Sequence, residues 1–228
     1  MNSLRTNLAN FDAAIVDLDG TMVDTLGDFV VALNLMLDEL ALPRVSVQSI
    51  ATKVGKGSEH LIAAVLREAT GGEPPAALLD QAWQRYSTHY LAINGRHATV
   101  YPGVAEGLAA LRARGLRLAC LTNKPGDFAR PLLAAKGLAG YFEVVFGGDA
   151  FARKKPDPLP LAMTCEALGT LPGRTLMIGD SSNDAQAARA AGCPVLLVTY
   201  GYNHGHPVHE VDADGFVDSL AELAPPSR

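Results

Sequence analysis

Short apolar runs rich in Val, Ile and Leu recur along this chain, and a segment of helical character follows each of them. The runs are AAIVDLDG, GLRLACLTN, EVVFGGD, RTLMIGD and CPVLLVTYG. Their length and apolar character predict buried parallel strands. The segments between the later runs begin with Pro, Asp or Ser and end at Gly, as helices do. This alternation predicts an α/β fold, a Rossmann-like parallel sheet flanked by helices, with ligands bound beyond the carboxyl ends of the strands.

One long region interrupts the alternation. Between about residues 25 and 100, apolar positions recur at helical spacing and no convincing strand is present. We therefore expect an inserted α-helical cap domain at 25–100 and a discontinuous catalytic core formed by 1–24 and 101–228.

Within the insertion, three helices are predicted. The first begins at Thr25, with Asp28 near its first turn in an approximate capping arrangement. Two others cover residues 58–70 and 76–92. Trp83, Tyr86 and Tyr90 fall at helical spacing, which predicts packing residues rather than a surface for stacking bases.

Composition excludes several classes of function. The chain has 228 residues, of which 48% are hydrophobic and 19% charged, as in a packed soluble enzyme. Its net charge of −5 and scattered basic residues argue against nucleic acid as a partner. The sequence shows no secretory signal and no stretch suited to a bilayer, so we expect no membrane association and a cytoplasmic location. Cys120, Cys165 and Cys193 lie in apolar segments, which predicts reduced thiols in the core.

Carboxylates gather at predicted strand ends. Asp17 and Asp19 follow the first apolar run, and residues two apart on an extended chain point the same way. Such a pair repels unless a cation or a shared proton lies between its members, and a hard divalent ion is the obvious partner. Asp180 follows another strand, and Asp184 lies four residues later. Asp184 can equally complement a helix N-terminus while Asp180 starts a turn, and the two interpretations are compatible.

Two further groups complete the pattern. Thr122 stands at a strand end with a hydroxyl donor, and Lys155 precedes a Pro-constrained turn. Alone, the first is more often a helix cap and the second a surface charge. Together with the carboxylates and a divalent cation, they supply what hydrolysis of a phosphate monoester requires, namely a positioned nucleophile and neutralised phosphoryl oxygens.

The segments DLDGT, LTNK, KKPDP and GDSSND occur in this order and resemble the motifs of the haloacid dehalogenase superfamily of phosphatases. The resemblance implies that Asp17 is the nucleophile, forming an aspartyl-phosphate, and that Asp19 acts as general acid and then general base. It implies that Mg²⁺ is the cofactor, held by the Asp17 carboxylate, the Asp19 backbone carbonyl and Asp180, with Asp184 orienting waters or Lys155.

For the substrate, the resemblance implies that Thr122 and Asn123 hold phosphoryl oxygens and that Lys155 offsets negative charge. The segments TKVGKGSEH and TYGYNHG, with GGD and KPDPLPL between them, are similar to bacterial phosphoglycolate phosphatases. This similarity favours 2-phosphoglycolate, and Lys56, between two glycines, is a candidate for binding its carboxylate.

Other functions stay open at this point. Within the superfamily these are a phosphatase of another small sugar or amino-sugar phosphate and a phosphomutase; outside catalysis, the alternative is a phosphate-binding regulator. The chain can be a monomer or a homodimer. His204, His206 and His209 lie in a segment with Gly and Pro, which predicts a surface loop rather than a metal site.

Overall fold

The five apolar runs form neighbouring strands of one parallel sheet. In the computed structural model, which describes residues 8–224, the sheet has six strands in the order β5-β4-β1-β6-β7-β8. The strands are β1 (Ala13–Val16), β4 (Arg117–Leu121), β5 (Val144–Phe146), β6 (Thr175–Gly179), β7 (Val195–Val198) and β8 (Gly215–Val217). All five neighbouring pairs are parallel. The predicted fold class is confirmed.

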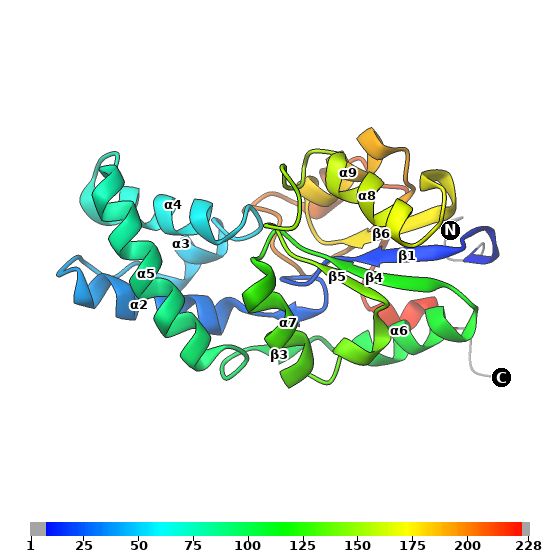
Figure 1. Cartoon of the computed structure of the whole chain (residues 1–228), viewed down its shortest axis with the longest axis horizontal. Helices are drawn as coiled ribbons and strands as arrows, with labels where there is room; N and C mark the ends of the chain where they lie inside the picture. Colours follow the sequence, from blue (N-terminus) through cyan, green and yellow to red (C-terminus); the bar gives the residue numbers. More distant parts are fainter. Residues whose placement is uncertain (1–7, 225–228) are drawn as a thin grey trace.

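Helices cover both faces of this sheet (Figure 1). Alternate residues of β1 point to opposite faces: Ala14 and Val16 pack in one apolar cluster, and Ala13 and Ile15 in the other. The first cluster is completed by α6 (Val104–Ala113) and α7 (Gly126–Ala135), and the second by α8 (Leu159–Ala167) and α9 (Ser182–Ala191). Short 3-10 helices lie at Leu8–Asn10, Ala139–Tyr141, Pro172–Arg174, Val208–Glu210 and Leu220–Leu223.

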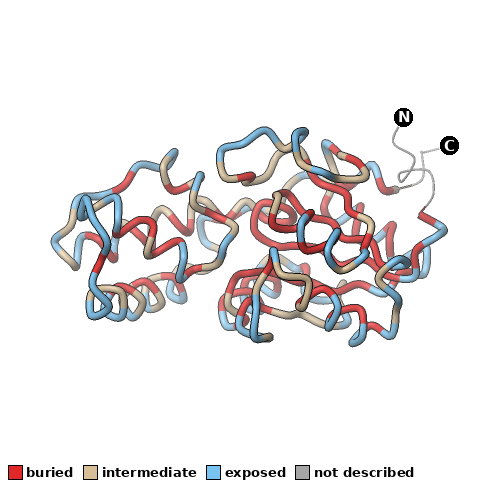
Figure 2. The backbone as a smooth tube through the Cα atoms, turned by 90° about the horizontal axis from the view of Figure 1, so that it is seen from above, coloured by how far each residue is buried: buried red, intermediate tan, exposed pale blue. Residues whose placement is uncertain are grey.

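Four helices lie between β2 (Val23–Asp24) and β3 (Thr99–Val100), to one side of the sheet, and are called the cap below (Figure 1). They are α2 (Leu26–Glu39), α3 (Val47–Ala51), α4 (Ser58–Thr70) and α5 (Ala76–Ile93). Their apolar faces enclose a cluster of their own, in which Tyr86 and Tyr90 are fully buried and Trp83 is partly buried. The prediction that these aromatic residues pack is confirmed. Seen from above, buried residues run through the inner strands of the core and along the cap helices (Figure 2).

One expectation about the insertion is wrong. Residues 25–100 do contain a strand, because β3 (Thr99–Val100) pairs antiparallel with β2 (Val23–Asp24) where the chain leaves and re-enters the core. Two-residue strands leave no periodic pattern in the sequence. The outermost ends of the predicted core, 1–7 and 225–228, lie outside the described residues.

The three cysteines are free and buried, as the sequence predicts. Within residues 8–224, no helix combines the length and apolar character needed to cross a bilayer.

Candidate active site

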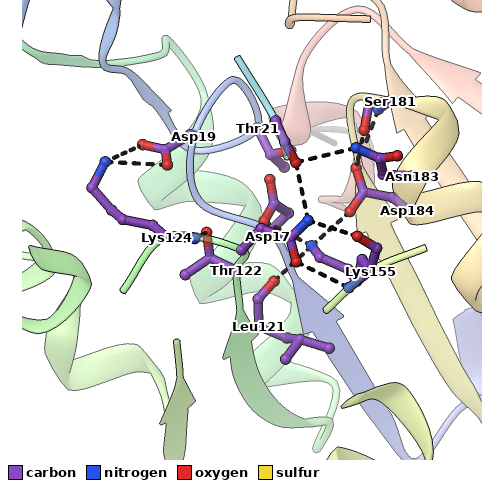
Figure 3. A network of polar contacts seen from close by, with 12 residues as sticks. Asp17, Asp19, Thr21, Leu121, Thr122, Lys124, Lys155, Ser181, Asn183 and Asp184 are labelled. Carbon is purple, nitrogen blue, oxygen red and sulfur yellow. Dashed lines mark hydrogen bonds and ion pairs between the residues drawn. The ribbon is translucent and has the colours of Figure 1, made fainter. Parts of the chain in front are cut away.

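The polar residues at the strand ends converge on one edge of the sheet. Asp17 follows β1, Thr122 and Asn123 follow β4, and Asp180 follows β6, and these three strands are neighbours. Parallel strands present their carboxyl ends at the same edge, so residues far apart in sequence meet there (Figure 3). All of these residues line one cavity between the core and the cap.

Lys155 lies at the centre of this group. Its Nζ donates to Asp17 Oδ1 at 2.8 Å, to Asp184 Oδ1 at 2.7 Å and to the Leu121 carbonyl at 2.8 Å. An ammonium has three N–H donors, so all three are used. Burial lowers the pKa of Lys155, but the nearby carboxylates of Asp17 and Asp184 have the larger combined effect and raise this pKa above its ordinary value. The neighbouring Lys154 instead pairs with Glu59 of the cap at 2.6 Å.

Three buried carboxylates stand close together beside this lysine. One oxygen from each of Asp17, Asp180 and Asp184 lies within 4.8 Å of the other two. Burial raises the pKa of Asp17 to about 7, against the opposing influence of Lys155. Burial, together with the charges of Asp184 and Asp17, raises the pKa of Asp180 well above its ordinary value. One lysine cannot balance three carboxylates, and their oxygens are the ligands that a hard divalent cation prefers.

Asp184 contacts Lys155 and also caps a helix. Its Oδ1 holds Lys155, and its Oδ2 accepts hydrogen bonds from Ser181 N and Oγ in a capping box at the start of α9. Asp180 is held by Thr21 Oγ1 at 3.2 Å and by Tyr202 N at 2.5 Å. The acids are therefore fixed by the fold as well as by one another.

Gly20 allows the first loop to approach Asp180. Its φ is +86°, in the left-handed region, and an added Cβ would lie 2.3 Å from Asp180 Oδ2. This position of the DLDGT segment therefore requires glycine for two reasons.

Asn123 is occupied by backbone partners. Its Oδ1 accepts from Lys155 N at 3.0 Å, and its Nδ2 donates to Lys155 O at 2.8 Å and to Gly55 O of the cap at 3.0 Å. With these contacts, the side chain holds the Lys155 backbone and the cap loop. The sequence predicts phosphoryl contacts for this residue, whereas the side-chain amide has its donors engaged elsewhere. Thr122 lines the cavity, and its Oγ1 accepts from Lys124 N at 3.2 Å.

Asp19 has two partners that sequence reasoning missed. Lys124 Nζ lies 2.9 and 3.2 Å from its two carboxylate oxygens, and Thr25 Oγ1 donates to Oδ1 at 2.8 Å. Lys124 also lies over the rings of Phe29 and Tyr90, 4.4 and 4.7 Å from their centroids. The only sequence signal for Lys124 is its place in LTNK, directly after two predicted site residues.

The capping role expected for Thr25 is wrong. It stands at the N-cap of α2, but its side chain makes no cap hydrogen bond because the hydroxyl turns to Asp19. Asp28, in the first turn, is fully buried and accepts from the backbone N–H groups of Gly95 and His97 at 2.7 Å each. Both side chains therefore connect the cap's first helix to other parts of the molecule.

The structure does not bring Lys56 into the cavity. Gly55, Gly57 and Ser58 line it, but the Lys56 side chain is exposed. The Gly55 carbonyl is held by two core amides, Asn123 Nδ2 at 3.0 Å and Asn183 Nδ2 at 3.1 Å. The loop therefore contacts the core through its backbone.

The histidines of the C-terminal loop have partners outside the acidic cluster. His204 contacts Asn183 Nδ2 at 3.2 Å beside the Gly55 loop, and His209 packs edge-on against Phe216. Among residues 8–224, the acids Asp17, Asp180 and Asp184 form the group whose geometry suits a metal ion.

The cavity is small in this conformation. Its volume is ≈ 20 Å³, enough for about one water molecule. A phosphate ester is larger than this volume.

Known proteins resemble this chain over most of its length. A family model described as a haloacid dehalogenase-like hydrolase matches residues 11–192. A protein of Thiobacillus denitrificans named phosphoglycolate phosphatase is 48% identical over 93% of both chains. One of Nitrosospira multiformis with the same name is 47% identical over 92% of both. The crystal structure of a predicted phosphoglycolate phosphatase from Haemophilus somnus 129pt superposes with a TM-score of 0.90 at 33% identity, covering 94% of this chain and 96% of that one.

Proposed function

Because this chain belongs to the haloacid dehalogenase-like hydrolases, we propose that it hydrolyses 2-phosphoglycolate to glycolate and phosphate. The relatives named phosphoglycolate phosphatase support this substrate, since they match nearly the whole chain, including the cap. The observation that carries the chemistry is the buried contact of 2.8 Å between Asp17 and Lys155 beside two further carboxylates. It pairs a nucleophile with a fixed positive charge.

In the first step the Asp17 carboxylate attacks phosphorus and the ester P–O bond breaks, which leaves an aspartyl-phosphate. Asp19, at the same loop, donates a proton to the departing glycolate oxygen. In the second step Asp19 takes a proton from water, whose oxygen attacks phosphorus and releases phosphate and free Asp17. The Thr122 hydroxyl would donate to a phosphoryl oxygen, and the positive charge of Lys155 would offset the negative charge on these oxygens.

The proposed cofactor is Mg²⁺, held by the carboxylates of Asp17 and Asp180 and the backbone carbonyl of Asp19. When bound, it supplies positive charge to the phosphoryl oxygens and to the attacking carboxylate. The close carboxylate oxygens of Asp17 and Asp180 fit a small hard cation. Asp184 would keep Lys155 oriented through their 2.7 Å contact.

The cap would exclude bulk water during the reaction and carry part of the substrate specificity. Its loop at Gly55 contacts the core amides, which supports a closed state in which the cavity is shielded. A cytoplasmic location stays a prediction, consistent with three free thiols.

The test is kcat/KM for phosphate release with Mg²⁺ on a panel of 2-phosphoglycolate, sugar phosphates, an amino-sugar phosphate and pyrophosphate. We expect 2-phosphoglycolate to lead by on the order of 100-fold, about 2.7 kcal/mol of transition-state discrimination. Asp17→Asn should abolish release of phosphate. Another leading ester would refute the substrate but keep the chemistry, and no turnover at all would favour a phosphate-binding regulator.

A further inference from the structure

A second buried lysine lines the cavity on the side of Asp19. The Lys124 side chain is 1% exposed, and its Nζ contacts both Asp19 oxygens. Phe29 from α2 and Tyr90 from α5 supply aromatic faces to the same ammonium, so the cap contributes to its position. A buried ammonium needs strong acceptors, and this one is fixed where the two parts of the protein meet.

The two lysines of the cavity differ in their remaining capacity to donate. Lys124 and Lys155 are the cationic side chains among the described residues that line it. Lys155 uses its three N–H donors on three separate oxygens. Lys124 Nζ, within the described part of the chain, has the single carboxylate of Asp19 as its oxygen partner. It therefore retains donor capacity for an anionic group of a ligand.

The chemistry of the proposed substrate places such a group near Lys124. In 2-phosphoglycolate one methylene separates the ester oxygen from the carboxylate carbon. Asp19 must approach that ester oxygen to protonate it. A cation about 3 Å from the Asp19 carboxylate is then within reach of the substrate carboxylate.

Resting on the proposed function, we propose that Lys124 binds the substrate carboxylate and so selects 2-phosphoglycolate over esters that lack one. The exposed Lys56, the candidate from the sequence for this task, does not line the cavity. With substrate bound, the Lys124 ammonium donates to the carboxylate and keeps its place over the aromatic rings. An ester with an uncharged group in place of the carboxylate offers no such acceptor, so the Lys124 ammonium gains no anionic partner from that substrate.

The test compares kcat/KM for 2-phosphoglycolate with that for 2-hydroxyethyl phosphate, in which an uncharged group replaces the carboxylate. Lys124→Met should reduce the preference for 2-phosphoglycolate by between about 10- and 100-fold, the range for hydrogen bonds to charged groups. Lys124→Gln, a neutral variant that can still donate to Asp19, should change the preference in the same direction, and Lys124→Arg should restore part of it. Lys53→Met is the matched control, because Lys53 pairs with Glu68 within the cap and does not line the cavity.

The outcomes separate the two proposals. Equal losses on both esters in Lys124→Met and Lys124→Gln would mean that Lys124 serves Asp19 alone, which overturns its assignment but leaves the proposed substrate standing. Loss of the preference in Lys56→Met instead would also overturn it. A wild-type enzyme that turns over other esters without any preference for 2-phosphoglycolate would refute the proposed function itself, and the role of Lys124 with it.

Discussion

Replacing Asp180 with Asn tests whether the carboxylate cluster is a metal site. If it is, the charge of Asp180 should destabilise the protein without metal and stabilise it with metal. Asp180 is buried and its pKa is raised well above the ordinary value by burial and by the charges of Asp184 and Asp17. A raised acid pKa means that ionisation of Asp180 destabilises the folded state at neutral pH. Removing this charge should therefore stabilise the metal-free protein.

Bound Mg²⁺ should make the wild type more stable than Asp180→Asn. An ion present at 100 times its dissociation constant stabilises the protein by about 2.7 kcal/mol. For a chain of this size, 1 kcal/mol shifts the melting temperature by about 2–4 °C, so Mg²⁺ should raise that of the wild type by about 5–11 °C. Asp180→Asn keeps oxygen and nitrogen atoms for Tyr202 N and Thr21 Oγ1 but loses a charged ligand. Most of the rise in melting temperature caused by Mg²⁺ should therefore be absent in Asp180→Asn.

The assay is thermal unfolding after removal of metal with a chelator, with and without added Mg²⁺. The wild type should melt below Asp180→Asn without metal and above it with metal. Asp80→Asn, which changes an exposed acid on the cap, should follow the wild type in both conditions. A variant that melts lower than the wild type without metal, or that gains the full Mg²⁺ shift, would refute the reasoning.

Three other substitutions test single contacts of the site. Lys155→Met leaves Asp17 buried without its 2.8 Å partner, so we expect a loss of about 3–5 kcal/mol in metal-free unfolding and no phosphate release; wild-type melting would contradict this. Thr25→Val removes the 2.8 Å hydroxyl donor to Asp19 and should lower kcat by about 10-fold, whereas an unchanged kcat would exclude a positioning role. Asp28→Asn weakens the acceptor of two backbone N–H groups and should cost about 2 kcal/mol, measured by urea unfolding; an unmoved midpoint would count against it.

The core could be predicted from the sequence because its strands are continuous apolar runs. All five predicted runs are strands, and the acids that follow them meet as expected at one edge. β8 was missed, since its three residues Gly215–Val217 are too few to show a pattern and are defined by pairing with β7. The short helix α3 was missed for a similar reason: its five residues, Val47–Ala51, do not complete two turns.

The contacts of the site depend on tertiary structure more than on motif spacing. The sequence places Lys124 next to Thr122 and Asn123, but its partner Asp19 lies 105 positions earlier. Strand alternation alone does not show that the Asn123 side chain would turn to the Lys155 backbone, 32 positions away. A motif identifies which residues gather at the strand ends, whereas the direction of each side chain follows from the loops that pack around it.

The two buried lysines differ in how far their surroundings depend on the cap. Lys155 is bound by acceptors from the core alone, so its position does not depend on where the cap lies. Lys124 belongs to the core, but Phe29 and Tyr90, which cover it, belong to the cap. Opening of the cap would therefore leave the phosphoryl site intact and remove the aromatic faces from Lys124. Selection of the carboxylate would then be complete only when the cap closes, which couples recognition of the substrate to the exclusion of water.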